Sequence, residues 1–372
     1  MKICFVAHTN HSNSRSWIRY FANDLGHDVH VISVSAECEP IPGVKHHHVV
    51  LNGERKWMYF LAIPQVRRLV HRIAPDLLIG YRVQSNGFMA ACTGFHPLIL
   101  AAQDEKIVTP PDSRLLRQVV RFTLRRGDWF NAWGEHMAHH MERLGAPRSR
   151  IVVRSRGVDL SVFHPPDPAR PSFRPDARPT IVTTRGLYPH YRHDVLVDAM
   201  GLVVREHPDA LLLVVGKGPS EGEIRADVRR RGLEKNVELV GGVEHRAVAH
   251  YVQRAHVYTA VVETEGISSS LMEAMACGTF PVVLDLDASR FFIKDGENGL
   301  LVPAARADEL GERLSRALGD AALRARAAEQ NLKAIRRDHD WALNMRKMEA
   351  EYSEIVRTRR ERLRAGSDDA SL

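Results

Sequence analysis

The pattern of apolar and polar positions predicts a chain in which short buried strands alternate with amphipathic helices. KICFVA (residues 2–7) has the pattern of a strand, SRSWIRYFANDLG (14–26) has helical spacing, and HDVHVISV (27–34) is again typical of a strand. Further segments of this alternation follow at residues 57–73, 75–81, 87–94 and 97–102. Because such alternation is typical of parallel sheets covered by helices on both faces, the first half predicts a doubly wound α/β fold.

The same alternation begins again after a proline-rich stretch. Six prolines fall within residues 163–179, and proline both removes backbone donors and stiffens the chain, so a linker is predicted at 164–179. The segments after it are 179–186, 194–208, 210–218, 236–242 and 255–263. The chain therefore predicts two Rossmann-like halves joined by a proline-rich hinge.

Two Rossmann-like halves are also typical of dehydrogenases, and the glycine pattern argues against that class. A dinucleotide site needs G-x-G-x-x-G directly after a strand, because the glycines let the pyrophosphate approach the backbone. The first strand is followed by AHTNHSNSRSW, which has no glycine, and VVGKGPSEGE in the second half supplies Gly216 and Gly218 without the third glycine.

The segment ETEGISSSLMEAMACG (263–278) has the composition of a ligand-binding helix start. Gly266 allows close approach to the backbone, an apolar helical pattern begins at residue 269 or 270, and Gly278 is typical of a helix end. Free N–H groups at such a start, at the carboxyl end of a strand, suit phosphate oxygens. Glu265 precedes this helix and Glu273 lies about one turn inside it, so the two acids are placed to hold separate parts of a ligand.

This segment resembles the E-x7-E motif of the family 4 retaining glycosyltransferases (glycosyl transferases group 1), which have the GT-B fold. The resemblance covers most of the chain through EGISSSLMEAMACGTFPVVLD, KDGENGLLVP, HDVHVISV, PDLLIG, RSRGVDLSVFHP, VTTRGLYPHYRHDVLVDAM, GKGP and NVELVGGV. Their order and spacing together are specific, although each motif alone is weak. The resemblance implies an α/β protein of two Rossmann-like domains whose parallel sheets face a central cleft.

The resemblance also implies roles for individual residues. Glu265 would contact hydroxyls of the donor sugar, Glu273 would bind the nucleotide ribose, and Arg185 matches the phosphate-binding arginine of the family. The backbone of residues 268–271 would bind the diphosphate, with retention of anomeric configuration and no bound metal. The expected donor-binding residues are Gly216, Val243, Gly266, Ser268, Ser269, Ser270, Leu271 and Glu273, and the expected catalytic residues are Asp104, Arg185, Arg192 and Glu265.

The chain departs from the family pattern in three places. No lysine follows Arg185, so Arg192 is the candidate second cation, with the same charge and a different geometry. HTNHSNSRS replaces the glycine-rich loop after the first strand, and AAQDEKI replaces a histidine found in many members. These segments leave Asn10, His11, Ser14, Arg15, Gln103, Asp104 and Glu105 as polar candidates.

Structural interpretations remain open beside the functional ones. Residues 268–270 can simply cap a helix, Glu273 can be a solvated surface acid, and Arg185 can serve only as a partner for a neighbouring carboxylate. Asp159 is better explained as a turn residue than as a substrate contact. It is the joint occurrence of these residues that favours a sugar-nucleotide site.

The resemblance assigns acceptor binding to residues 1–163 and donor binding to residues 180–340, with a helix at about 341–364 that packs back on the first domain and a disordered tail at 365–372. The expected co-substrate is a UDP- or GDP-sugar, no cofactor is expected, and the acceptor is a hydroxyl of a saccharide, a lipid-linked or a small molecule. The alternatives are a GT-B nucleotide-sugar epimerase, or a non-catalytic sugar-nucleotide-binding or membrane-surface protein.

The net charge of +7 and the pI of about 9.4 raise the question of an anionic partner. Residues 113–126 form a predicted amphipathic basic helix, with Arg114, Arg117, Arg121 and Arg125 mostly opposite its apolar side. Such a helix suits an anionic membrane surface, and a solvated helix face is the alternative. Nothing in the sequence has the pattern of a nucleic-acid-binding motif, so no nucleic-acid partner is expected.

Apolar runs are all too short to span a bilayer, and the first residues have the pattern of a strand and not of a signal peptide. The expected location is the cytoplasm, with a peripheral position at the inner face of the membrane as a further expectation. The four cysteines lie far apart without CxxC spacing, so they are expected to be reduced packing residues.

Overall fold

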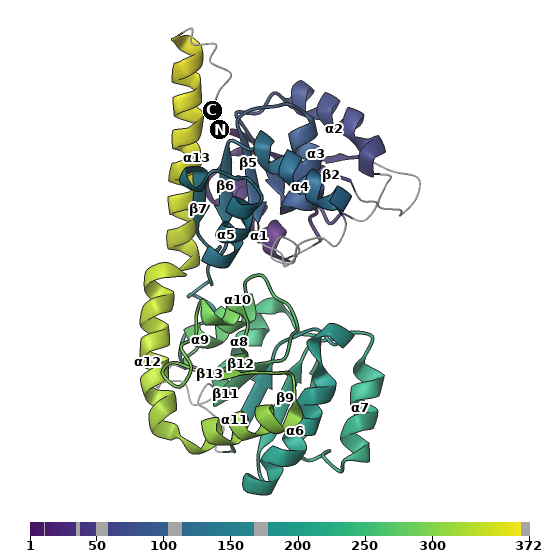
Figure 1. Cartoon of the computed structure of the whole chain (residues 1–372), viewed down its shortest axis with the longest axis vertical. Coiled ribbons are helices and arrows are strands. Elements are labelled where there is room, and N and C mark those ends of the chain that lie inside the picture. Colours follow the sequence, from purple (N-terminus) through teal and green to yellow (C-terminus); the bar gives the residue numbers. More distant parts are fainter. Residues whose placement is uncertain (11, 35–37, 50–58, 103–113, 167–177, 366–372) are drawn as a thin grey trace. The chain divides into compact units, whose positions relative to one another are not determined.

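The computed structural model describes residues 1–10, 12–34, 38–49, 59–102, 114–166 and 178–365. The chain forms two compact units: residues 1–156 together with 343–372, and residues 157–342 (Figure 1). The chain passes from the first unit to the second at Arg156–Gly157 and returns at Ala342–Leu343. Most of the predicted linker (167–177) and of the predicted tail (366–372) lies outside the described residues.

The first unit is built on a parallel sheet of seven strands in the order β3-β2-β1-β4-β5-β6-β7. Its strands are β1 (Lys2–Val6), β2 (Asp28–Ser33), β3 (Lys45–His48), β4 (Leu77–Tyr81), β5 (Leu98–Ala102), β6 (Trp129–Ala132) and β7 (Ile151–Val153). Its helical segments are α1 (Ser12–Arg19), η1 (Tyr20–Asp24), α2 (Tyr59–Ile73), η3 (Arg82–Asn86), α3 (Gly87–Cys92), α4 (Arg114–Arg126), α5 (Glu135–Arg143), η5 (Arg148–Arg150) and α13 (Trp341–Arg364), the last of which belongs to this unit from Leu343 onward.

An aromatic cluster joins α13 to the core of the first unit. Phe5 on β1 packs edge-on against Trp17 at 6.0 Å between ring centroids, and Phe21 stacks on Tyr352 of α13 at 5.7 Å. These four rings are almost completely buried. The burial of such large apolar side chains explains why a helix at the C-terminal end of the sequence is part of the N-terminal unit.

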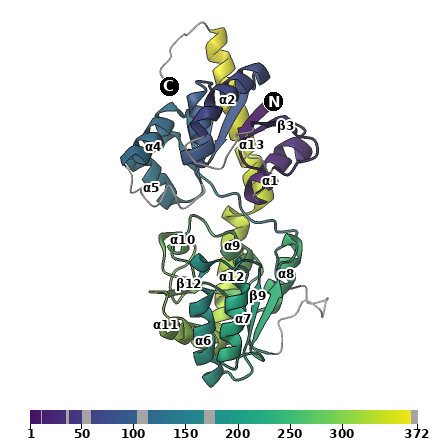
Figure 2. The same cartoon turned by 90° about the vertical axis from the view of Figure 1, so that its right-hand side faces the viewer.

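The second unit is built on a parallel sheet of six strands in the order β10-β9-β8-β11-β12-β13 (Figure 2). Its strands are β8 (Thr180–Thr183), β9 (Leu211–Val215), β10 (Val237–Gly241), β11 (Val257–Ala260), β12 (Phe280–Leu284) and β13 (Leu300–Val302). Its helical segments are η7 (Pro189–Tyr191), α6 (His193–Glu206), α7 (Glu221–Arg230), α8 (His245–Arg254), α9 (Ser269–Ala276), α10 (Asp287–Arg290), α11 (Ala307–Gly319) and α12 (Ala321–Asp338).

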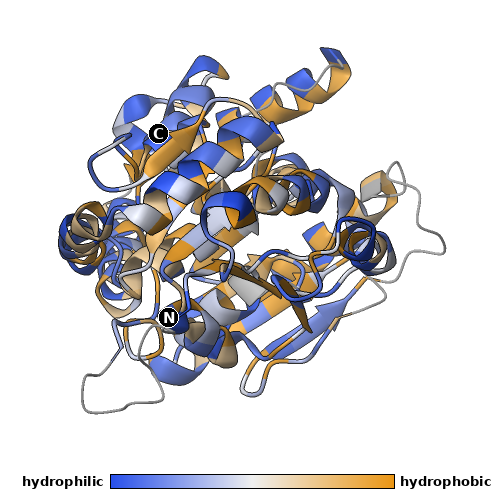
Figure 3. Ribbon diagram, turned by 90° about the horizontal axis from the view of Figure 1, so that it is seen from below, coloured by the Kyte–Doolittle hydropathy of each residue, from blue (hydrophilic) through white to orange (hydrophobic). Residues whose placement is uncertain are grey.

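The core of the second unit lies between the sheet and its amphipathic helices. Strand residues such as Leu212 and Val282 pack with the inner positions of α6 and α11, among them Met200 and Leu314. The helices alternate between hydrophobic and hydrophilic residues along their length (Figure 3), as helices that cover a sheet with one face do. These helices therefore have the amphipathic pattern that the sequence predicted for them.

Both sheets have the doubly wound topology that the sequence predicted. In each sheet the first strand of the unit lies in the interior, and the strand order reverses beside it: between β1 and β4 in the first unit, and between β8 and β11 in the second. Ligands of open α/β sheets bind at the carboxyl ends of the strands at such a reversal. None of the described helices has both the length and the apolar character that crossing a membrane requires.

Candidate active site

The carboxyl ends of β8 and β11 bring the strongest candidate residues together. The two strands are paired, with Ile181 opposite Val257, so the loops that follow them are neighbours at the reversal of strand order. The β8 loop carries Arg185 and the β11 loop carries Glu265. Residues 80 positions apart in the sequence therefore meet at the edge where this fold binds ligands.

Arg185 is held between an acid and a hydroxyl. Its Nη2 donates to Glu265 Oε1 and to Ser268 Oγ, the latter at 2.6 Å, and its guanidinium lies 5.3 Å from the centroid of the Tyr191 ring. The side chains of Arg185 and Glu265 are only 12% and 13% exposed. Burial by itself lowers the pKa of Arg185, but the Glu265 carboxylate and the phenols of Tyr258 and Tyr191 raise the pKa above its ordinary value, so the guanidinium stays charged.

Two glycines after β9 allow this loop arrangement. A Cβ at Gly216 would collide with the carbonyl oxygen of Arg185, and one at Gly218 would collide with that of Leu187. Leu187 N donates to the carbonyl of Lys217 at 3.1 Å, which ties the β8 and β9 loops together. In the structure Gly216 thus positions the backbone of Arg185; its expected role at a nucleotide remains a prediction.

The serines at the start of α9 are engaged within the protein. Ser268 Oγ accepts from the backbone N–H of Leu271 at 3.3 Å, and Ser270 Oγ accepts from the hydroxyl of Tyr258 at 2.9 Å. Ser268 and Ser270 are buried and Ser269 is half-buried. Ser268 therefore caps the helix, as the structural interpretation holds. Among the described hydrogen bonds the backbone N–H groups of Ser269 and Ser270 have no acceptor, which keeps them available to an anion.

Glu273 is a buried acid with a histidine partner, so the interpretation as a solvated surface acid is wrong. Its carboxylate is nearly inaccessible, and Oε1 lies 2.8 Å from Nε2 of His245 at the start of α8. The exposed His245 ring lies 5.3 Å from the ring of Phe163. The sequence did not point to His245; its position directly after the strand and glycines of NVELVGGVEH was the available signal.

Arg192 lies on the same loop as Arg185 but points its charge elsewhere. Its Nη2 pairs with Asp194 at 3.0 Å and its Nη1 with Glu263 at 3.3 Å, and its side chain is 32% exposed. Its backbone is in the left-handed region, with φ of 40°, at the start of α6. Among the described residues, the side-chain bonds of Arg192 go to Asp194 and Glu263 and not to the Arg185 cluster.

The remaining candidates are dispersed. Gly266 is buried in the β11 loop, and Val243 is half-buried in the loop after β10, where Gly241 has φ of 84°. Asp104 lies outside the described residues, as do Gln103 and Glu105. Asp159 accepts from the backbone N–H of Ser161 at 2.9 Å, which supports the predicted turn.

In the first unit, the loop after β1 is tied to the segment after β2. Arg15 Nη1 pairs with Glu39 Oε2 at 3.3 Å, and Asn10 Oδ1 accepts from the backbone N–H of Glu39. Ser14 Oγ donates to the carbonyl of His8 at 2.5 Å. Within the described parts of the chain, His, Cys, Asp and Glu side chains do not gather in a group of three or more that could hold a metal ion.

Solved structures show which class of fold this is. HepE from Anabaena, solved with UDP, superposes with a TM-score of 0.79 over 95% of this chain and all of its own, at 16% identity. Sucrose-phosphate synthase from Thermosynechococcus elongatus superposes with a TM-score of 0.78 over 96% of this chain and all of its own, at 18% identity. The two doubly wound units are those of a GT-B protein.

Two family models match consecutive parts of the chain. Glycosyl transferase 4-like matches residues 2–131, and Glycosyl transferases group 1 matches residues 168–334, the part that contains Arg185, Glu265 and Glu273. The chain belongs to the group 1, family 4-like glycosyltransferases.

Curated relatives are similar over a shorter length. Phosphatidyl-myo-inositol mannosyltransferase of Mycobacterium leprae is 37% identical over 40% of this chain and 39% of its own. D-inositol 3-phosphate glycosyltransferase of Jonesia denitrificans is 32% identical over 54% of this chain and 50% of its own. The chain thus spans about half the length of the curated relatives it matches, or less.

Proposed function

We propose that the protein transfers a glycosyl unit from a nucleoside diphosphate sugar to a hydroxyl acceptor, with retention of anomeric configuration. The observation that carries this proposal is the buried cluster of Arg185, Glu265 and Ser268 at the strand reversal of the second unit. Departure of a diphosphate builds negative charge on the leaving oxygen, so a fixed cation there lowers the barrier. Arg185 supplies that charge without having to reorganise, because its position is held by two partners.

The remaining donor contacts follow from the same edge of the sheet. Glu265 binds hydroxyls of the donor sugar, and the N–H groups of Ser269 and Ser270 bind the diphosphate at the positive end of α9. Glu273 accepts from the ribose hydroxyls, and His245 orients its carboxylate at 2.8 Å. Arg192 is a second cation only if the donor draws it away from Asp194 and Glu263.

The donor is a UDP- or GDP-sugar in this proposal. HepE was solved with UDP-glucose, and a Corynebacterium glutamicum relative, 27% identical over 64% of this chain, is named as GDP-mannose-dependent. The second unit binds the donor and the first unit binds the acceptor. The relatives' names point to inositol-based acceptors, one of them a phosphatidyl lipid, so D-inositol 3-phosphate and phosphatidylinositol are the first acceptors to test.

A cytoplasmic location at an anionic membrane surface is the accompanying proposal, and α2 to α4 support it. Phe60 on α2, Phe88 on α3 and Phe122 on α4 form a row of rings with centroids 5.5 and 5.9 Å apart. Phe60, Phe122 and Leu115 are exposed, and so are most of the arginines of α4. A surface with apolar tips and adjacent cations suits anionic lipid.

A thermal-shift titration with UDP-, GDP-, ADP- and TDP-sugars tests the donor site. Binding at a hundredfold excess over the dissociation constant adds about 2.7 kcal/mol to the free energy of unfolding, which raises the melting temperature measurably. Product analysis then separates the alternatives. Transfer to an acceptor supports the proposal, an isomerised donor or free sugar indicates an epimerase, and binding without turnover indicates a sugar-nucleotide sensor.

Vesicle sedimentation tests the membrane surface. The protein should sediment with vesicles that contain phosphatidylserine and not with purely zwitterionic ones, and the double variant Arg117→Glu/Phe60→Ser should lose this binding. Arg230→Glu, an exposed arginine of the second unit, is the matched control. Equal binding to both vesicle types would remove the anionic preference from the proposal, and binding to neither would remove membrane attachment; both results leave the transferase assignment untouched.

A further inference from the structure

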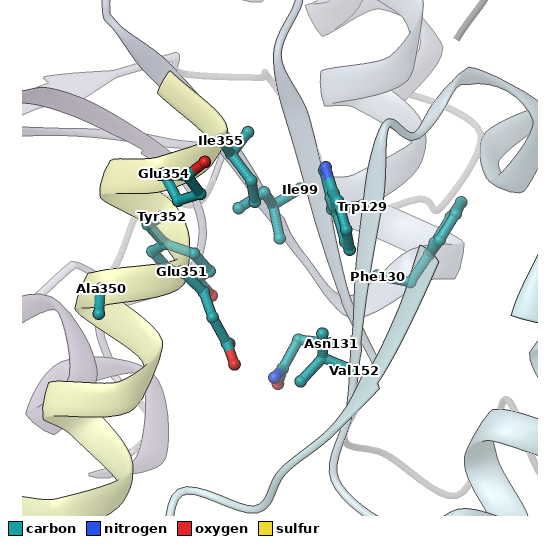
Figure 4. A pocket seen from close by; sticks show the side chains of 10 residues that line it. All are labelled: Ile99, Trp129, Phe130, Asn131, Val152, Ala350, Glu351, Tyr352, Glu354 and Ile355. Carbon is teal, nitrogen blue, oxygen red and sulfur yellow. The ribbon is translucent and has the colours of Figure 1, made fainter. Parts of the chain in front are cut away.

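The first unit contains an apolar cavity between its sheet and α13. The cavity has a volume of about 350 Å³, in the range of small-ligand pockets. Ile99, Trp129, Asn131 and Val152 line it from β5, β6 and β7, and Ala350, Glu351, Tyr352, Glu354 and Ile355 line it from α13 (Figure 4). Ile99 is opposite Trp129 and Asn131 is opposite Val152 in the strand register, so these four side chains project from one face of the sheet.

Two buried polar groups in the cavity wall have no partner. Asn131 and Tyr352 are each only 3% exposed. Asn131 Oδ1 and the Tyr352 hydroxyl make no hydrogen bond within the part of the chain that the structure describes. Buried polar groups are nearly always paired, and a ligand with one donor and one acceptor would satisfy this unpaired acceptor and this unpaired donor on the wall of one cavity. Burial raises the pKa of the Tyr352 phenol well above its ordinary value, so the hydroxyl stays protonated and can donate.

A second, charged cavity adjoins the apolar one. Its volume is about 220 Å³, and it shares Trp129, Glu354 and Ile355 with the first. Its other lining residues are His96, Pro97, Asp128, Thr358, Arg359 and Arg362. Trp129, the first residue of β6, forms part of the wall of both cavities.

Asp128 and Glu354, the acids that line the charged cavity, each have a partner within the protein. Asp128 Oδ2 lies 2.7 Å from His96 Nδ1, and Glu354 pairs with Arg357 at 2.6 Å. Arg359 is half-exposed and has no carboxylate partner among the described residues. The guanidinium of Arg359 is therefore available to an anionic group at this end.

We propose that these two adjoining cavities together bind one small anionic amphiphile. Its carboxylate or phosphate lies at Arg359. Its apolar chain, which bears one hydroxyl or amide, lies between β5–β7 and α13. The hydroxyl or amide on the ligand's apolar chain donates to Asn131 Oδ1 and accepts from the Tyr352 hydroxyl. The charged end lies beside the first residue of β6, at the amino ends of the strands, whereas the proposed transfer site lies at the carboxyl ends of a different sheet. The ligand is therefore neither donor nor acceptor of the transfer reaction.

Calorimetric titration of the full chain with decanoate, decanol and 5-hydroxydecanoate tests the proposal. Decanoate should bind saturably at one molecule per chain, and 5-hydroxydecanoate more tightly. Arg359→Ala should weaken decanoate about tenfold and leave decanol unchanged, because it removes only the charged contact. Val152→Phe should abolish binding of all three by filling the cavity, and Asn131→Leu should remove the preference for the hydroxylated chain.

Two variants outside the cavities serve as controls for decanoate binding. Arg364→Ala removes an exposed arginine of α13 that lines neither cavity, and Phe60→Ser removes the apolar tip of α2; both should bind decanoate like the wild type. The melting temperature of each variant shows whether it folds, and Arg359→Ala changes only a side chain at the surface. Absence of saturable binding to the wild type, or unchanged binding in both Val152→Phe and Arg359→Ala, would overturn the proposal.

Discussion

Two arginines on one loop, Arg185 and Arg192, have the same charge and different surroundings. Arg185 is 12% exposed and reaches across to the β11 loop, where it binds Glu265 and Ser268. Arg192 is 32% exposed and pairs with Asp194, two residues away, and with the exposed Glu263. Exposed pairs contribute little to stability, whereas removing one partner of a buried pair leaves a charge without compensation. Burial therefore makes Arg185 the residue on which the site depends.

Replacing Arg185 should have the largest effect. Arg185→Ala is expected to lower kcat about 10²- to 10³-fold, because the fixed charge at the leaving diphosphate is lost. It should also destabilise the second unit by about 3 kcal/mol, because Glu265 remains buried without its partner. Steady-state kinetics and urea unfolding measure the two effects. Arg185→Lys, which keeps the charge but not the planar guanidinium, should give values between those of Arg185→Ala and the wild type. Wild-type turnover in Arg185→Ala would remove Arg185 from the mechanism.

Burial also affects the protonation of His339, which makes this residue a second test of how burial and exposure change a charged group. Burial lowers the pKa of His339 to about 4 from its ordinary value of 6.5, with Asp338 acting against this and Arg337 acting with it. The folded state therefore holds His339 neutral while the unfolded state gains a proton. The resulting stability is complete above about pH 6.5 and is lost as the pH falls towards 4, by about 3 kcal/mol at most.

Urea unfolding at pH 7 and pH 4.5 measures this loss. Acidic residues also titrate in this range, so the informative quantity is the difference between the wild type and His339→Gln, which cannot take up the proton. The variant should lose less stability between the two pH values. His190→Gln, which changes an exposed histidine on the β8 loop, is the control and should follow the wild type.

The acid of α9 should have a smaller, binding-specific effect. Glu273→Ala is expected to weaken nucleoside diphosphate binding about 10- to 100-fold, since it removes a charge-assisted contact to the ribose. Calorimetric titration with UDP and GDP measures this change, and thermal unfolding checks that the variant still folds. His245→Ala should weaken binding less, because His245 only orients the carboxylate. Equal affinity of Glu273→Ala and wild type would assign Glu273 a structural role.

The smallest effect is expected at Arg192. Arg192→Ala should change kcat by no more than about threefold and stability by less than about 1 kcal/mol, because its ion pairs are exposed and screened by salt. The same assays as for Arg185 apply. A loss of turnover comparable with that of Arg185→Ala would mean that Arg192 leaves its two acids when the donor binds, and the contrast between the two arginines would then describe only the free protein.

Local patterns determined most of the fold. Runs such as LLLVV (211–215) are apolar throughout because both faces of a parallel strand are buried, and they were found as β9 and its neighbours. The start and end of α9 followed from its serines and from Gly278, which has φ of 78°. Helix starts and strand patterns depend on residues within a few positions of each other, so the sequence carries them directly.

The sequence did not reveal which residues distant in the chain contact each other. The histidine that contacts Glu273 lies 28 positions before it, and Tyr258 lies beneath Ser270 only because β11 leads into α9. The sequence identified Arg185 and Glu265 through their motif, but not that they bind each other. It also offered Arg192 as a candidate second cation, since charge alone does not reveal which side chain is buried.

The sequence by itself determined two doubly wound halves, the family motif and the acids that flank the start of α9, because periodicity, glycine placement and capping are local properties. Only the tertiary structure decided which of two arginines is buried, that the serines are bonded within the protein, and that α13 encloses a cavity with unpaired polar groups against the first sheet. The reason is physical: burial and desolvation depend on elements distant in the chain, and these set the strength of every charged or polar contact.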